Sequence, residues 1–431
     1  MQTQELIGNS IYELCAKLFP ICRSITGNGV RKTIEIINDY IKDTGLIFNS
    51  TEVPSGTDVY DWTVPEEWVI RNAYIEDADG NHIVDFKENN LHIMGYSAPI
   101  DEWVELERID EYIFVLEDNP DWIPYITSYY KKRVGFCMSK KCRDSMKRNK
   151  YHLVVDSEFV QGSLTYADLI IKGSTDDEIL ITSYICHPSM ANNECSGPSL
   201  LSEIVKYVCS LKDRKYTYRF VLEPETIGAI CYIHDHYEEL GKVKAAFNLS
   251  CVGDDRGYYL VETATGTSLS DRVAKNVMKD LDGFKIYPFF ERGSDERQYN
   301  SVGVDVPMIC VGRSKYSEYP EYHTSADDLR LVSSRGFEGS YKVMTDIIYV
   351  LENNNRYFCT VKCEPQLGKR GLYPTVSTKD SFDKVYAIIN VIAYSNGKKD
   401  VIELSDLLGV KARELIGIIG RLVENGLLRL V

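Results

Sequence analysis

The chain has 431 residues, of which 44% are apolar and 26% are charged. This balance is typical of a soluble globular protein, and the length predicts about two or three domains rather than one. The formal net charge of −15 argues against nucleic-acid binding driven by charge alone.

The N-terminal segment, MQTQELIGNSIYELCAKLF, lacks a basic region, an uninterrupted apolar run and a cleavage site of small residues. No run in the sequence approaches the roughly 18 apolar residues that a membrane-spanning helix needs. The 12 cysteines are spread along the chain without a Cys-x-x-Cys pair, which is typical of free thiols in a reducing compartment. We therefore expect a cytoplasmic protein with no membrane partner.

The first two thirds of the chain predict an α/β domain with an insertion. Residues 4–19 and 30–41 carry apolar side chains at helical spacing, which predicts two helices. Residues 57–125 contain all four tryptophans and short alternating runs joined by turns, which predict a small β-rich inserted domain. From residue 151 to 354, apolar strand-like runs alternate with helix-like runs. This alternation predicts a mixed, mostly parallel sheet with helices on both faces.

The last part of the chain predicts a winged helix. Helix-like segments at 382–395, 403–408 and 412–424 are followed by a short strand-like run. Basic residues only slightly outnumber acidic ones here, whereas a DNA reader usually has a denser basic stripe. We therefore expect this unit to pack within the chain or to contact a protein partner or a second copy of the chain, and we do not expect a nucleic-acid partner. The predicted domains are residues 1–56 with 126–365 (α/β), 57–125 (insertion) and 366–431 (winged helix).

Polar residues follow four of the predicted strands, at the edge where α/β sheets bind ligands. His187 and Glu225 each follow an apolar strand, Asp254 follows a third, and His323 lies after the last. Imidazole nitrogens with carboxylate oxygens suit zinc better than magnesium, which prefers oxygen ligands alone. If the fold brings the two histidines together, a bound zinc would activate water and a glutamate would carry the proton to the leaving amine.

Each of these residues also has a structural interpretation. A histidine at a strand end is commonly a hydrogen-bonded part of the core, and an acidic residue commonly caps the next helix. In the same way, Arg23 could bind a carboxylate or phosphate through its planar guanidinium, or the turn after it could simply begin a helix.

Several longer stretches carry a resemblance to a known family. They are ICRSITGNGVR, VYDWTVPEEWVIRNAYI, PYITSYY, CHPSMANNECSGPS, PETIGAI, GSDERQY and YPEYHTSADDL. Over nearly the whole chain they resemble a bacterial uncharacterised family with an aminopeptidase-like domain, a β-rich insert and a C-terminal winged helix, often linked to polysaccharide biosynthesis. The four strand ends resemble those of the co-catalytic zinc exopeptidases. The resemblance implies a zinc-exopeptidase-like fold.

The resemblance also implies roles for individual residues. The expected metal ligands are His187, Asn193, Glu194, Asp254 and His323. Glu225 is the expected catalytic residue, although Pro224 interrupts the family's Glu-Glu pair and leaves open whether Glu223 or Glu225 is the base. The expected substrate-binding residues are Arg23, Arg292, Asp295, Tyr319 and Tyr322.

Two positions depart from the exopeptidase pattern. Asn193 stands where the family has a bridging carboxylate, and Ser250 stands where it has a strand-end Asp. Because a neutral amide cannot offset the charge of two close zinc ions, we expect one zinc ion.

The sequence favours a zinc-dependent hydrolase of the aminopeptidase type that cleaves an amide or peptide bond of a small peptide or of an aminoacylated or acylated sugar. The alternative is a catalytically degraded exopeptidase fold that acts as a binding or scaffold protein in polysaccharide biosynthesis. A DNA-binding regulator that senses a ligand through its large domain is a third hypothesis.

Overall fold

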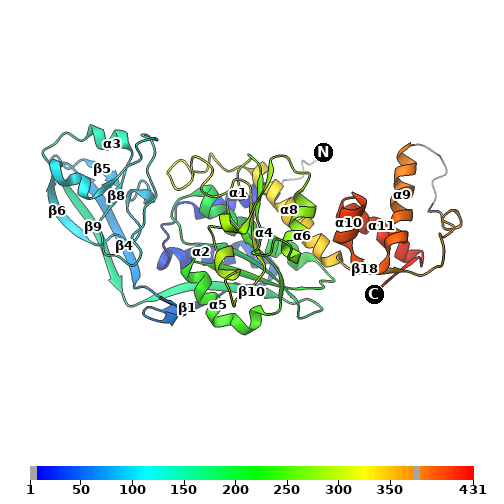
Figure 1. The fold of residues 1–431 in the computed structure, drawn as a ribbon. Helices are drawn as coiled ribbons and strands as arrows, with labels where there is room; N and C mark the ends of the chain where they lie inside the picture. The colour runs from blue at the N-terminus through cyan, green and yellow to red at the C-terminus, as the bar shows by residue number, and fades with distance from the viewer. Residues whose placement is uncertain (1–6, 373–378) are drawn as a thin grey trace.

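The computed structural model describes residues 7–372 and 379–431, and it shows three lobes in a row (Figure 1). An α/β lobe lies in the middle, a β-rich lobe lies on one side and the C-terminal lobe lies on the other. Residues 4–6 of the first expected helix lie outside the described residues. Within the described part of the chain, no helix is both long enough and apolar enough to cross a membrane.

The middle lobe is built on an eight-stranded sheet with the strand order β1-β10-β12-β11-β13-β16-β14-β15. Its strands are β1 (Asn49–Pro54), β10 (Ser163–Ile171), β11 (Glu178–Tyr184), β12 (Thr217–Glu223), β13 (Val243–Leu249), β14 (Tyr258–Val261), β15 (Phe284–Tyr287) and β16 (Met308–Gly312). The four central strands, from β12 to β16, run parallel to one another. The pairs β1–β10, β10–β12 and β14–β16 are antiparallel. The predicted mixed sheet with a parallel centre is confirmed.

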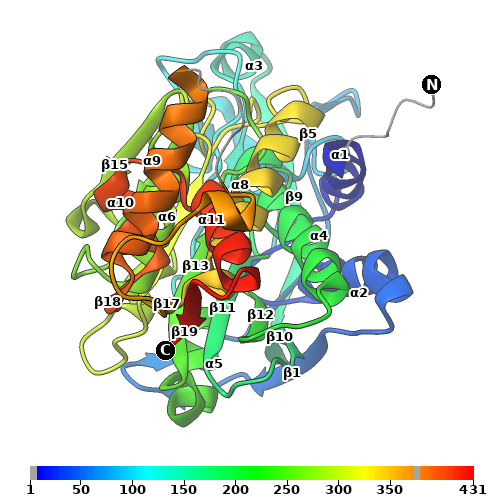
Figure 2. The ribbon, with the colours of Figure 1, turned by 90° about the vertical axis from the view of Figure 1, so that its right-hand side faces the viewer.

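The two faces of this sheet enter different hydrophobic cores. Along β11, Ile179 and Ile181 belong to one core and Leu180 belongs to the other, because successive side chains of a strand point to opposite faces. The first face is covered by α1 (Ile7–Leu18), α2 (Asn28–Ile41), α4 (Ser196–Ser210), α6 (Leu269–Met278) and α8 (Ser334–Asn353). The second face is covered by α5 (Ile227–Leu240). Helices therefore lie on both faces, as predicted (Figure 2).

The inserted lobe contains a four-stranded antiparallel sheet in the order β5-β4-β9-β6. Its strands are β4 (Glu67–Glu76), β5 (His82–Asp85), β6 (Ile100–Glu105) and β9 (Lys150–Val160). The sequence placed β9 in the α/β domain, but the structure pairs it with β4 and β6, since its alternating apolar residues fill the core of the insertion. The smaller elements of this lobe are β7 (Ile113–Phe114), β8 (Phe136–Cys137) and α3 (Lys140–Ser145). The short strands β2 (Asp58–Val59) and β3 (Trp62–Thr63) lie beside α5 of the α/β lobe.

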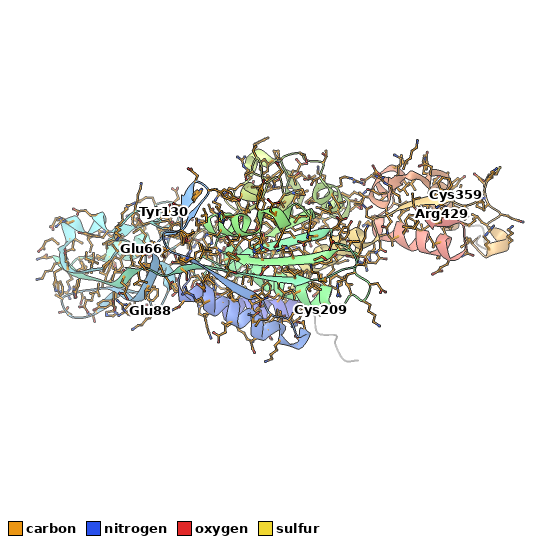
Figure 3. All side chains as sticks on the ribbon, turned by 90° about the horizontal axis from the view of Figure 1, so that it is seen from below. Glu66, Glu88, Tyr130, Cys209, Cys359 and Arg429 are labelled. Carbon is orange, nitrogen blue, oxygen red and sulfur yellow. The ribbon has the colours of Figure 1, made fainter. Side chains whose placement is uncertain are left out.

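The C-terminal lobe has the elements expected of a winged helix. They are α9 (Lys379–Tyr394), β18 (Asn396–Asp400), α10 (Val401–Leu408), α11 (Ala412–Glu424) and β19 (Leu428–Leu430). A strand that precedes the expected boundary, β17 (Arg356–Cys359), completes its small sheet. The chain's cysteines are all free thiols, and Figure 3 shows Cys209 and Cys359 in different lobes.

Helix α11 packs against the α/β lobe. In helix-turn-helix proteins the equivalent helix enters the DNA major groove through its N-terminal residues. Here Arg413, in the first turn of α11, pairs with Asp346 of α8. A second ion pair lies nearby: Lys411, just before α11, lies 3.5 Å from Asp280. The N-terminal end of α11 is therefore engaged by acidic residues of the same chain.

Candidate metal-binding active site

The candidate site lies at the carboxyl ends of the parallel strands. His187 follows β11 and Glu225 follows β12. The loop that contains Asp254 follows β13, and His323 lies in the loop after β16. Because these four strands are neighbours and run in the same direction, their following loops meet at one edge of the sheet.

The two histidines lie side by side. Their ring centroids are 5.6 Å apart, so the expected meeting of the two rings is confirmed. Tyr125 packs edge-on against both rings, at 5.2 Å from His187 and 5.0 Å from His323. Its backbone N–H also donates to the carbonyl of His323, and Tyr322 stacks on the His323 ring at 3.8 Å. Aromatic contacts therefore fix both imidazoles.

The orientation of His187 is set by a buried carboxylate. Nδ1 of His187 lies 2.9 Å from Oε2 of Glu194, whose side chain is only 1% exposed. This bond leaves Nε2 on the other side of the ring, where it lies 3.7 Å from Oε2 of Glu225. Metal-binding histidines characteristically donate one ring N–H to such a carboxylate and present the other nitrogen to the ion. Glu194 thus orients His187 from behind.

His323 presents a free nitrogen. Its Nε2 is buried and has no hydrogen-bond partner among the described residues. Burial, and then the neighbouring His187, lower the pKa of His323 to about 3, so the ring is neutral at physiological pH. A neutral imidazole with an unused nitrogen is the form that binds a metal ion.

The two glutamates after β12 lie in different environments. Glu223 is fully buried and accepts hydrogen bonds from Tyr299, and burial raises the pKa of Glu223 to about 8. The Glu225 side chain is 23% exposed and accepts from Ser294 Oγ at 2.9 Å. Burial also raises the pKa of Glu225, although His187 opposes this effect. Glu225 is the glutamate that lies beside the histidine pair.

Asp254 has a different set of partners. Its carboxylate accepts from the backbone N–H and hydroxyl of Ser314, the backbone N–H of Arg256 and the side-chain amide of Asn192. A carboxylate has about four acceptor positions, so the protein itself occupies them. Asp254 therefore joins three loops, and we find no contact between it and the histidine pair in the described part of the chain.

The segment that carries Asn193 and Glu194 is a π-helical turn, Ala191–Cys195, a conformation common at functional sites. Asp327 accepts from the backbone N–H groups of Asn192 at 2.6 Å and Asn193 at 3.0 Å. Asp327 therefore joins the His323 loop to this turn. The side-chain Oδ1 of Asn193 is buried and has no donor among the described residues.

Several of the ten described non-glycine residues with a positive φ lie at this edge of the sheet. A positive φ is rare outside glycine. It occurs at Ser189 (33°), Thr226 (67°), Cys251 (52°) and His323 (56°). Each follows one of the four central strands, and strain of this kind commonly accompanies functional sites.

Only some of the predicted substrate-binding residues lie near the histidine pair or Glu225. Tyr322 lies on the His323 ring, and Tyr319 is buried and donates to Asp327 at 2.8 Å. Asp295 is buried behind Glu225, where it accepts from the backbone N–H of Thr226. Arg292 is exposed and packs over Phe289, and no described contact joins it to the histidine pair.

Arg23 lies beneath the site. Its guanidinium is 1% exposed and donates to the carbonyls of Leu18 and His187, at 2.8 and 3.0 Å. It also lies 3.4 Å from Glu194. These contacts use the guanidinium to hold the His187–Glu194 pair in place.

Two of these side-chain atoms have a spacing close to that of neighbouring zinc ligands. Tetrahedral zinc, with bonds of about 2.0–2.1 Å, holds neighbouring ligand atoms about 3.3 Å apart, close to the 3.7 Å between His187 Nε2 and Glu225 Oε2. His323 Nε2 supplies a further unused donor. A second possible donor set places Cys186 Sγ with His187 and Glu194 within 4.8 Å of one another. That set would have to break the His187–Glu194 bond, and burial raises the pKa of Cys186 to about 11.

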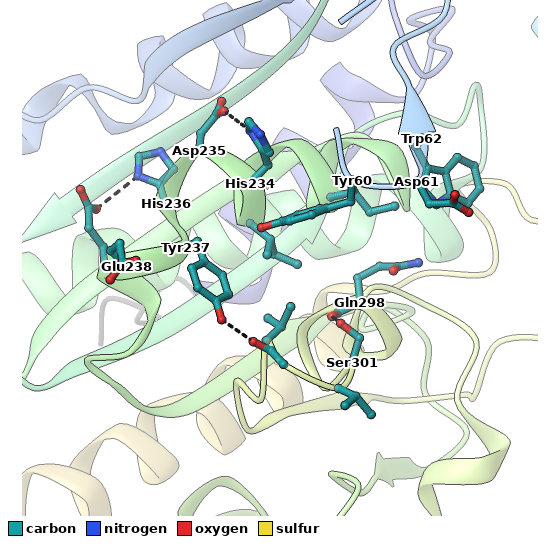
Figure 4. Close-up of a pocket in the computed structure, with 16 residues that line it drawn as sticks. Tyr60, Asp61, Trp62, His234, Asp235, His236, Tyr237, Glu238, Gln298 and Ser301 are labelled. Atoms are coloured by element: carbon teal, nitrogen blue, oxygen red, sulfur yellow. Dashed lines mark hydrogen bonds and ion pairs between the residues drawn. The ribbon is translucent and has the colours of Figure 1, made fainter. Parts of the chain in front are cut away.

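A separate pocket of about 720 Å³ lies on the outer side of α5 (Figure 4). Tyr60, Trp62 and Tyr237 line it, and all three are exposed. None of the predicted site residues is among the residues that line this pocket. Its surroundings therefore do not contribute to the histidine site.

Sequence reasoning did not single out Tyr125 or Ser294, which contact the histidine pair and Glu225. Tyr125 reaches the site because its segment pairs with the His323 loop, through the Pro124–Thr324 bridge. The PYITSYY stretch was one of the family-like segments, but nothing in its pattern placed it beside a loop so distant in the chain.

Comparisons with known proteins agree with this architecture. A family model described as a domain of unknown function, DUF4910, matches residues 12–354, and a winged helix-turn-helix model matches residues 355–430. A relative from Clostridium acetobutylicum is 40% identical over all of this chain and 98% of its own length. It is provisionally named a polysaccharide biosynthesis protein with an aminopeptidase-like domain.

Two solved structures extend the comparison. A provisionally assigned peptidase from Clostridium acetobutylicum is 39% identical, has a TM-score of 0.92, and matches 98% of this chain and 96% of its own. The zinc aminopeptidase BSAP from Bacillus subtilis has a TM-score of 0.57 at 16% identity, over 81% of this chain and 96% of its own. The latter likeness shows the aminopeptidase fold.

Proposed function

This chain belongs to the DUF4910 family and has the aminopeptidase fold, and from that premise we propose that it is a zinc-dependent hydrolase that cleaves an amide or peptide bond. The observation that carries the proposal is the pairing of two buried imidazoles beside the partly exposed Glu225. Nε2 of His323 has no hydrogen-bond partner among the described residues, and Nε2 of His187 lies 3.7 Å from Glu225. His187, His323 and Glu225 would hold one zinc ion or line its open position. When bound, zinc supplies an activated water and polarises the substrate carbonyl.

The protein's own groups divide the remaining work. Glu194 binds Nδ1 of His187 and so directs Nε2 toward Glu225. Glu225, with its raised pKa, accepts a proton at its carboxylate and returns it to the leaving nitrogen. Ser294 orients that carboxylate through its hydroxyl. Tyr125 and Tyr322 cover the imidazoles and exclude water from the rear of the site.

The substrate class is part of the proposal. We propose a small peptide or an aminoacylated or acylated sugar, because the fold is that of aminopeptidases and a close relative carries a polysaccharide-biosynthesis name. The test is hydrolysis of a panel of aminoacyl and N-acetyl-sugar amides by the zinc-loaded protein. Glu225→Gln should lower kcat by about 10²–10⁴. If zinc-loaded wild type and Glu225→Gln are equally inactive on the whole panel, the hydrolase proposal fails.

A specific observation favours a second candidate, a binding or scaffold protein that keeps the fold without the activity. Asp254 is fully engaged by its own chain, and Asn193 contributes an amide instead of a carboxylate. Both features reduce the negative charge available to a metal ion. This candidate predicts a metal-free protein in which substitution of His323 leaves the structure and partner binding unchanged.

We also propose that the winged helix serves packing or protein contact, and not nucleic-acid binding. The support is the engagement of Arg413 and Lys411 by acidic residues of the α/β lobe. A contact with a protein partner or a second copy of the chain, and a cytoplasmic location, belong to the same proposal.

A further inference from the structure

Two buried cationic side chains, Arg313 and Lys315, have no anionic partner in the described part of the chain. Arg313 is 8% exposed and Lys315 is 9% exposed. Among the described residues, no carboxylate lies within the 4.0 Å of an ion pair from either side chain, and Nε of Arg313 is buried without any hydrogen-bond partner. Both residues line a pocket of about 220 Å³ between the β14–β15 edge and the loop after β16.

Other buried cations of this chain lie beside carboxylates. Arg219 is 2% exposed and lies 2.6 Å from Glu178, and Arg23 lies 3.4 Å from Glu194. The chain has a net charge of −15, so carboxylates are plentiful. The unpaired state of Arg313 and Lys315 is therefore a local feature of this pocket.

Aromatic rings only partly compensate for the buried charge. The Arg313 guanidinium lies 3.9 Å from the centroid of the Tyr258 ring. The Lys315 ammonium lies 4.6 Å from the centroid of Tyr316 and 5.0 Å from that of Tyr287. Such contacts offset only part of the free-energy cost of burying an unpaired ion. A bound anion from outside the chain would compensate the remaining positive charge.

The carboxylates near the pocket interact with other side chains. Glu318, which also lines the pocket, accepts from the Tyr287 hydroxyl at 2.5 Å. Glu321 pairs with Arg256 at the pocket rim. The exposed Lys285 adds a further positive charge at the opening. The pocket is therefore cationic in an acidic protein.

We propose that this pocket binds a tetrahedral oxyanion between Arg313 and Lys315, as inorganic phosphate or as the phosphate group of a small phosphorylated molecule. The planar guanidinium can bind two oxygens of such a group, and the ammonium adds a point charge. A volume of about 220 Å³ holds the phosphate group and a small part of what it is attached to, since sites for whole drug-sized ligands begin at about 300 Å³. The pocket contains neither histidine, so the proposal does not rest on zinc.

The experiment uses the full chain with zinc removed by a chelator. Thermal unfolding and calorimetric titration are followed with inorganic phosphate, glucose 1-phosphate and glucose, each at low millimolar concentration and constant ionic strength. Wild type should show a saturable rise in Tm with phosphate and with glucose 1-phosphate, and none with glucose. A stronger effect of glucose 1-phosphate identifies a phosphorylated small molecule as the ligand, and an equal effect identifies free phosphate.

Three variants and a control separate the pocket from general salt effects, because phosphate stabilises many proteins non-specifically when concentrated. Arg313→Gln and Lys315→Met should weaken phosphate binding at least tenfold, and Lys315→Arg should restore it. Arg148→Gln changes an exposed arginine of the inserted lobe and should bind phosphate like wild type.

The stability of the variants without phosphate provides a second readout. Lys315→Met removes an unpaired buried charge and should leave the phosphate-free Tm unchanged or raise it. A clear fall in that Tm would show that the protein itself compensates the charge, and would overturn the proposal. So would the absence of a phosphate effect in wild type, or an equal effect in Arg313→Gln.

Discussion

The carboxylate of Glu194 lies 2.9 Å from Nδ1 of His187, and both side chains are buried. This contact fixes which ring nitrogen carries the proton and which one faces His323 and Glu225. It also explains why Glu194, which the sequence offered as a metal ligand, lies on the far side of the ring from the open donors. The active-site account depends on this division between a ligand and the carboxylate that orients it.

The first prediction concerns that orienting carboxylate. Glu194→Gln keeps the shape of the side chain but removes its charge, so His187 loses its anionic acceptor. Zinc affinity should fall by about 10–100-fold, the usual effect of removing such a partner. Competition with a fluorescent chelator measures it, and an unchanged affinity would mean that Glu194 does not act through His187.

The second prediction concerns Arg23. Arg23→Met removes the cation that lies 3.4 Å from the buried Glu194 and the donor to two buried carbonyls, and loss of one partner of a buried pair costs about 3–5 kcal/mol. The free energy of unfolding in urea should fall by this order. If stability were instead unchanged and KM rose, Arg23 would be a substrate-binding residue, as the sequence suggested.

The sequence was sufficient for the fold and for the central pair. The positions of His187 and His323 after apolar strands predicted a shared sheet edge, and alternation of strands and helices predicted the parallel centre. The same reasoning could not predict that the Asp254 carboxylate accepts hydrogen bonds from Ser314, Arg256 and Asn192. These donors come from loops far apart in the chain.

For a related reason, the sequence did not place Tyr125 at the site and assigned β9 to the wrong sheet. Both are decided by pairing with distant segments, and local periodicity is the same for either pairing. A strand that alternates apolar and polar residues is compatible with either sheet, and its pairing with β4 and β6 on both sides places β9 in the insertion.

The third prediction concerns pH and Glu223. Burial raises the pKa of Glu223 to about 8 in the folded protein, whereas an unfolded glutamate has a pKa of about 4.3. Between these values the folded state binds the extra proton, so this group stabilises fully below about pH 4.3 and its contribution is lost as pH rises through 8. The slope is at most about 1.4 kcal/mol per pH unit.

Glu223→Gln provides the comparison. Urea unfolding of the zinc-free protein at a series of pH values should show wild-type stability falling relative to the variant between about pH 5 and 8. Parallel stability curves for the two proteins would show that Glu223 is ionised at neutral pH in the fold.

The fourth prediction concerns the C-terminal lobe. Because Arg413 and Lys411 are engaged by the α/β lobe, the full chain should bind duplex DNA no more tightly than non-specific contacts allow. Fluorescence anisotropy at several salt concentrations measures this. Tight binding with a steep salt dependence would instead identify α11 as a DNA reader. Asp346→Ala frees Arg413 and tests whether the contact hides such an activity.

The most direct test of the account is the zinc content of the purified full-length protein and of its His187→Ala and His323→Ala variants, measured by elemental analysis with circular dichroism as the check on folding. The account predicts about one zinc per wild-type chain and its loss from both folded variants. A wild-type protein that takes up no zinc, or variants that retain it in full, would contradict the claim that these two imidazoles hold a metal ion.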